Sequence, residues 1–131
     1  MKVYQAVANA FVKEGASAVF GLIGDGNMTW VAAMAKHSEV QLIDARDEGG
    51  ALLMAEGWAR ATGRVGVCNV THGPGITRMT SSLITATRAG TPVVVYTSKT
   101  HLNDDKVNQA HDQERLVGAT GAGYLEVLNP A

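Results

Sequence analysis

The sequence has few of the features that mark secreted, membrane-bound or nucleic-acid-binding proteins. It contains one cysteine, Cys68, among 131 residues, so no intrachain disulfide can form. Its 11 basic and 12 acidic residues nearly balance, which argues against nucleic acid or an anionic membrane as a partner. The chain lacks an apolar signal core after Met1 and lacks a run of about 18 apolar residues. We therefore expect a soluble, cytoplasmic protein.

Hydrophobic residues are abundant, whereas aromatic residues are scarce. They make up 46% and 5% of the chain, which also holds 15 glycines. This composition is typical of a compact α/β domain and not of a disordered segment. The length fits one domain, covering residues 1–131, with a core that needs no disulfide or metal to stabilise it.

Short apolar runs alternate with segments of helical periodicity. The pattern predicts helices over residues 3–15, 28–37, 48–61, 76–88 and 111–118, and strands over residues 18–23, 40–44, 65–71, 92–97 and 124–128. Because the strands show no polar face, both sides of their sheet must be covered. We therefore predict an α/β fold with a doubly wound, mainly parallel sheet and helices on both faces.

In such a sheet, ligands bind beside the turns that follow the strands. These turns are expected at residues 24–27, 45–48, 72–75 and 98–103. In the first of them, Asp25 or Asn27 can cap the helix that follows.

Glu48 is the first candidate for chemistry, because it opens an alanine-rich helix and is followed by small residues. One interpretation is an acidic helix N-terminus that only complements the helix dipole. The other is a partly desolvated carboxylate that can share a proton with a ring nitrogen of a ligand.

The second candidate is the turn of residues 71–75, Thr-His-Gly-Pro-Gly, which lies between a strand and a helix. Its glycines allow the backbone to approach a flat ligand closely, although the turn is also compatible with an ordinary strand-to-helix connection. It is not a P-loop, because no Gly-Lys-Ser/Thr follows.

Five blocks of sequence carry a resemblance to a known family. They are VFG at 19–21, DARDE at 44–48, AEGWARATG at 55–63, GVCNVTHGPG at 66–75 and TPVVV at 91–95. In order and spacing they resemble the N-terminal pyrimidine-binding (PYR) domain of thiamine-diphosphate (ThDP) enzymes, within the acetolactate synthase and benzoylformate decarboxylase group. The resemblance covers residues 1 to about 128.

The resemblance implies ThDP as cofactor, with Glu48 as the catalytic carboxylate that promotes its imino tautomer. The residues that it places against the pyrimidine are Thr71, His72, Gly73, Pro74 and Gly75. The residues that it places on the substrate side are Gly24, Asp25, Gly26 and His101.

The chain departs from the family pattern in three ways. Asp47 and Gly49 replace the usual His and Gln or Asn beside Glu48, and the strand after Pro92 ends in Tyr-Thr-Ser-Lys at 96–99 instead of Gly-Asp or Gly-Ala. The third departure is that the diphosphate-binding (PP) domain, which holds the diphosphate through Mg²⁺, is absent from this chain. The Gly-Asp-Gly of residues 24–26 does not replace it, since residues 50–53 offer no second oxygen ligand. No metal ligand is therefore assigned.

The leading hypothesis is the pyrimidine-binding half of a ThDP-dependent lyase or transferase that decarboxylates or ligates small 2-keto acids. Activity would require a PP domain from a partner chain or from a C-terminal region, and the isolated chain would be inactive. A homodimer through the helices at residues 48–61 and 76–88 is also expected. The alternative is a non-catalytic dimerisation or assembly module of the same fold.

Overall fold

A computed structural model describes residues 1–100 and 107–129. Their four strands form one sheet in the order β2-β1-β3-β4, with every neighbouring pair parallel. The strands are β1 (Ala18–Gly21), β2 (Gln41–Asp44), β3 (Gly66–Asn69) and β4 (Val93–Tyr96). The predicted doubly wound α/β fold is confirmed.

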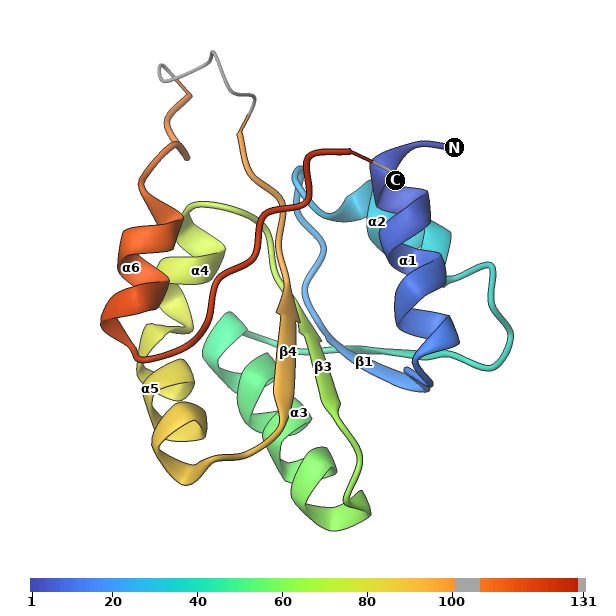
Figure 1. Cartoon of the computed structure of the whole chain (residues 1–131), viewed down its shortest axis with the longest axis horizontal. Helices are drawn as coiled ribbons and strands as arrows, with labels where there is room; N and C mark the ends of the chain where they lie inside the picture. Colours follow the sequence, from blue (N-terminus) through green and yellow to red (C-terminus); the bar gives the residue numbers. More distant parts are fainter. Residues whose placement is uncertain (101–106, 130–131) are drawn as a thin grey trace.

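Helices cover the two faces of this sheet (Figure 1). The helices are α1 (Val3–Lys13), α2 (Met28–Met34), α3 (Glu48–Thr62), α4 (Pro74–Arg78), α5 (Thr80–Ala89) and α6 (Gln113–Ala119). Helices α1 and α2 lie on one side, and α3 to α6 lie on the other. The central strands β1 and β3 are buried along their whole length, whereas the edge strands β2 and β4 are partly exposed.

The core on the α1 and α2 side is built around Trp30, which is 0% exposed. Its ring stacks on Tyr96 with 4.1 Å between centroids and meets the edge of Phe11 at 5.3 Å. The core on the other side consists of aliphatic and sulfur-containing side chains and Phe20, with Leu52 of α3 and Cys68 of β3 fully buried. Aromatic packing thus concentrates on one face, although the sequence has few aromatic residues.

Local signals explain where the long helix α3 begins and ends. The Asp47 carboxylate accepts a hydrogen bond from the Gly50 backbone N–H at 2.9 Å, which satisfies one free donor of the first turn. Gly63 ends the helix with φ of 70°, a conformation that glycine adopts without strain.

Two predictions of secondary structure were wrong. The helix expected over residues 76–88 is interrupted at Met79, where the Thr80 hydroxyl donates back to the Ile76 and Thr77 carbonyls and competes with the helical ladder. The strand expected over residues 124–128 does not join the sheet. That segment crosses beside β4 (Figure 1) and is attached by side chains instead, through a Lys99–Glu126 ion pair at 3.1 Å and the packing of Tyr124.

Candidate functional site

The turns after β1 and β3 lie against each other at the carboxyl edge of the sheet. The Gly26 backbone N–H donates to the Thr71 hydroxyl at 3.2 Å. A side chain at Gly24 would collide with Thr71, and one at Gly26 would collide with His72 and Ser98. The structure therefore brings four of the candidate residues together, and glycine is required at two of these positions.

The buried side chains of Asn27 and Asn69 hold the turn after β1 against β3. Asn27 is 0% exposed, and its Nδ2 donates to Asn69 Oδ1 at 2.5 Å and to the Leu22 carbonyl at 2.7 Å. Its Oδ1 accepts the Gly24 backbone N–H at 2.7 Å. The prediction of Asn27 as a helix-capping side chain was wrong, because these three bonds use the amide inside the loop and Asn27 makes no side-chain cap. The exposed Asp25 makes no side-chain cap either, since the cap position belongs to Asn27.

The turn of residues 71–75 is fixed on its other side by Ser98 and Gln113. His72 Nδ1 and Ser98 Oγ share a hydrogen bond of 2.8 Å. The Gly73 backbone N–H donates to Gln113 Oε1 at 3.0 Å, and Gln113 Nε2 donates to the Ser98 carbonyl at 3.0 Å. Gly73 has φ of 68°, and a side chain there would collide with Gln109. Sequence reasoning placed Ser98 in one of the expected ligand-side turns without singling it out and missed Gln113, because the two residues lie 26 and 40 residues from their partners in the turn.

Burial favours the neutral form of His72. Burial lowers the pKa of His72, the Asp25 carboxylate opposes this change, and His111 adds to the lowering. A neutral imidazole has one nitrogen that accepts and one that donates. His72 can therefore hold its bond to Ser98 and offer its other nitrogen to a ligand.

Glu48 lies apart from these turns, at the first position of α3. Its side chain is 16% exposed, and its Oε2 accepts a hydrogen bond from Arg78 Nε at 2.9 Å. Arg78 is the last residue of the five-residue helix α4, whereas the turn of residues 71–75 leads into its first. At about 1.5 Å of rise per residue, Pro74 and Arg78 are separated by roughly 6 Å along the axis of this helix. Glu48 and the turn border the two ends of α4 without touching in the contacts described.

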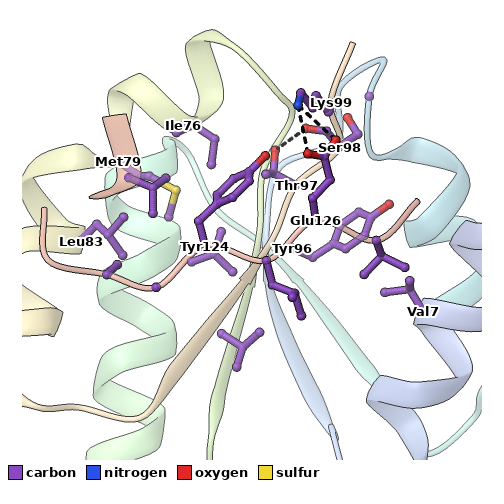
Figure 2. A pocket seen from close by; sticks show the side chains of 18 of the residues that line it. Val7, Ile76, Met79, Leu83, Tyr96, Thr97, Ser98, Lys99, Tyr124 and Glu126 are labelled. Atoms are coloured by element: carbon purple, nitrogen blue, oxygen red, sulfur yellow. Dashed lines mark hydrogen bonds and ion pairs between the residues drawn. The ribbon is translucent and has the colours of Figure 1, made fainter. Parts of the chain in front are cut away.

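Two hollows lie near the carboxyl edge of the sheet. A shallow one of about 440 Å³ is lined by Gly73, Pro74, Thr77 and residues 108–111. A larger groove of about 980 Å³ follows β4 and reaches Gly26 and residues 97–100, but it does not include Glu48. Figure 2 shows the apolar side chains of Ile76, Met79 and Leu83 on one side of Tyr124 and the polar end at Ser98, Lys99 and Glu126 on its other side. The candidate His101 lies outside the described residues.

A protein-family model described as thiamine pyrophosphate enzyme, N-terminal TPP binding domain, matches residues 1–119. The chain belongs to this family. The resemblance of the sequence blocks to this N-terminal domain is thereby confirmed, and the relatives below confirm the likeness to acetolactate synthases.

Curated relatives of this TPP-binding domain include acetolactate synthases and a glyoxylate carboligase. Acetolactate synthase 2, chloroplastic, of Nicotiana tabacum is 37% identical over 93 residues, which cover 71% of this chain and 14% of that protein. Glyoxylate carboligase of Escherichia coli O157:H7 is 37% identical over 100 residues, which cover 76% of this chain and 17% of that protein. Acetolactate synthase of Mycobacterium avium is 33% identical over 132 residues, which cover 97% of this chain and 21% of that protein. The chain thus spans about a fifth or less of the length of these relatives.

The residues present are compatible with the flat, polar ring of thiamine. Glu48 offers a carboxylate at a helix N-terminus, where the buried Gly49 lets the start of α3 pack closely against Ser82 and the Arg78 carbonyl. The turn of residues 71–75 offers closely packed backbone beside an open hollow.

Within residues 1–100 and 107–129, no cluster of three or more His, Cys, Asp or Glu side chains is arranged to hold a metal ion. In the same residues, no helix is long and apolar enough to cross a membrane.

Proposed function

We propose that this domain is the pyrimidine-binding half of a ThDP-dependent enzyme that decarboxylates or ligates small 2-keto acids. The family match over residues 1–119 is the observation that carries the proposal. The names of the relatives, acetolactate synthase and glyoxylate carboligase, support carboligation of 2-keto acids as the reaction class. ThDP, when bound, supplies the electron sink that such reactions need.

Glu48 is the residue we propose as the catalytic carboxylate. Its side chain is largely covered and starts a helix, so it can accept a hydrogen bond from the ring nitrogen of the pyrimidine when that nitrogen carries a proton, in surroundings that exclude most water. The amide of glutamine has nearly the same shape but cannot carry the negative charge that draws a proton onto that nitrogen. The carboxylate is therefore required, and not only a hydrogen-bonding group.

The turn after β3 is proposed to contact the flat face of the pyrimidine, through Thr71, His72, Gly73, Pro74 and Gly75. Its backbone is held in place by Gln113 and Ser98, so it requires little reorganisation when a ligand binds. Gly24, Asp25 and Gly26 lie directly beside it and are proposed to face the substrate. The diphosphate and its Mg²⁺ are assigned by this proposal to a PP domain in a further region or partner chain.

The test is Glu48→Gln in the assembly that contains both cofactor-binding domains, with turnover of pyruvate measured in the presence of ThDP and Mg²⁺. We expect turnover to fall roughly 10²- to 10⁴-fold, the usual contribution of a positioned acid or base. The free energy of unfolding should change by about 1 kcal/mol or less, because the ion pair with Arg78 is largely exposed on the arginine side.

Glu114→Gln provides a matched control, since Glu114 is the acidic residue in the first turn of α6 and is exposed. This variant should keep the turnover of the wild type. Unchanged turnover in Glu48→Gln would remove Glu48 from the catalytic role. It would then favour the alternative of an assembly module without its own activity.

A further inference from the structure

The ion pair between Glu48 and Arg78 joins two short segments whose backbones are packed closely. Arg78 Nε lies 2.9 Å from Glu48 Oε2. A Cβ atom at Gly49 would lie 3.2 Å from Ser82 Oγ and 3.6 Å from the Arg78 carbonyl oxygen. The start of α3 therefore sits directly against the junction of α4 and α5, and the ion pair spans this junction.

The two side chains of the pair differ in exposure. Glu48 is 16% exposed, whereas Arg78 is 65% exposed. An ion pair with one partner in water contributes little to folding stability. Its main physical effect is therefore on the orientation of the covered carboxylate, which would otherwise move among several rotamers.

The contact uses only one oxygen of the carboxylate. Arg78 bonds Oε2 through Nε, and the part of the chain that the structure describes gives Glu48 Oε1 no hydrogen-bond partner. A carboxylate accepts hydrogen bonds on both oxygens. One oxygen is therefore fixed by the protein, and the other is available to a ligand.

We propose that Arg78 is a positioning residue for Glu48, holding Oε2 so that Oε1 faces the pyrimidine ring of ThDP. This inference rests on the proposed function of Glu48. Helix α4 then contributes at both ends, because its first residues belong to the turn that contacts the ring and its last residue orients the carboxylate.

The experiment compares wild type, Arg78→Gln and Arg78→Lys in the assembly that contains both cofactor-binding domains. Affinity for ThDP is measured by titration calorimetry and turnover is measured with pyruvate. We expect Arg78→Gln to weaken ThDP binding at least 5-fold and to lower turnover at least 10-fold, with an unchanged thermal midpoint. Arg78→Lys, whose ammonium can still donate to Oε2, should recover most of both losses.

Arg88→Gln is the matched control, since Arg88 is exposed in the last turn of α5, and this variant should behave as wild type. Wild-type affinity and turnover in Arg78→Gln, or no recovery in Arg78→Lys, would overturn the positioning role. Glu48→Gln, measured in the same series, separates the two proposals, because unchanged turnover there defeats the proposed function itself. A wild-type assembly that does not bind ThDP overturns both.

Discussion

The sharpest stability prediction concerns Asn27, whose buried amide ties the turn after β1 to β3. Asn27→Ala removes three hydrogen bonds, to Leu22, Gly24 and Asn69. Each contributes about 1 kcal/mol net, and leaving the buried Asn69 Oδ1 unpaired costs about 1 kcal/mol or more. We therefore expect the free energy of unfolding to fall by about 4 kcal/mol, a large part of the roughly 5–15 kcal/mol available to a domain.

Urea unfolding followed by circular dichroism measures this loss, and a double-mutant cycle with Asn69→Ala isolates the bond between the two amides. The coupling energy should be about 1–3 kcal/mol, because the two side chains share one hydrogen bond in a buried position. Asn9→Ala is the control, as Asn9 is exposed on α1 and its loss should change stability by about 0.5 kcal/mol or less. A loss below about 1 kcal/mol for Asn27→Ala, or additive effects of the two substitutions, would refute the reasoning.

Two further predictions concern titratable groups. Burial raises the pKa of the Cys68 thiol to about 12, so a thiol reagent at neutral pH should label Cys68 only as fast as the protein unfolds, and rapid labelling of the native protein would contradict this. Burial lowers the pKa of His72 below its ordinary value of 6.5. Just below that pH, the unfolded chain therefore binds more protons than the folded chain does. The contribution of His72 to stability is lost as the pH falls. The thermal midpoint should therefore drop more between pH 7 and pH 5 in wild type than in His72→Asn, and parallel curves would show that His72 is not responsible.

The sequence was sufficient to predict the sheet, because its central strands are apolar runs that can only be buried. It was not sufficient to predict the contacts that shape the site. The pair of Asn27 and Asn69 is 42 residues apart, and the pair of Glu48 and Arg78 is 30 residues apart. Polar partners at such distances follow from the packing of helices and turns, which periodicity does not report.

The errors have physical reasons of the same kind. The apolar pattern of residues 124–128 suits a strand, but it does not say whether a neighbouring edge is used, and here side-chain contacts hold the segment instead. The break at Met79 depends on the Thr80 hydroxyl, which donates its hydrogen bond to backbone carbonyls instead of to solvent. The family resemblance was confirmed, because it relied on the order and spacing of five blocks rather than on any one of them.

The strand order β2-β1-β3-β4 divides the site into a stiff centre and a more compliant periphery. The turns after β1 and β3 follow strands that are hydrogen-bonded to a neighbour on both sides. We therefore expect local unfolding of these turns to be slower than that of the rest of the domain. Glu48 and Ser98 follow edge strands that have one neighbour each among the residues described. Under the proposed function, the surface beneath the ring is therefore rigid, while Glu48 and Ser98 at its margins can adjust their positions.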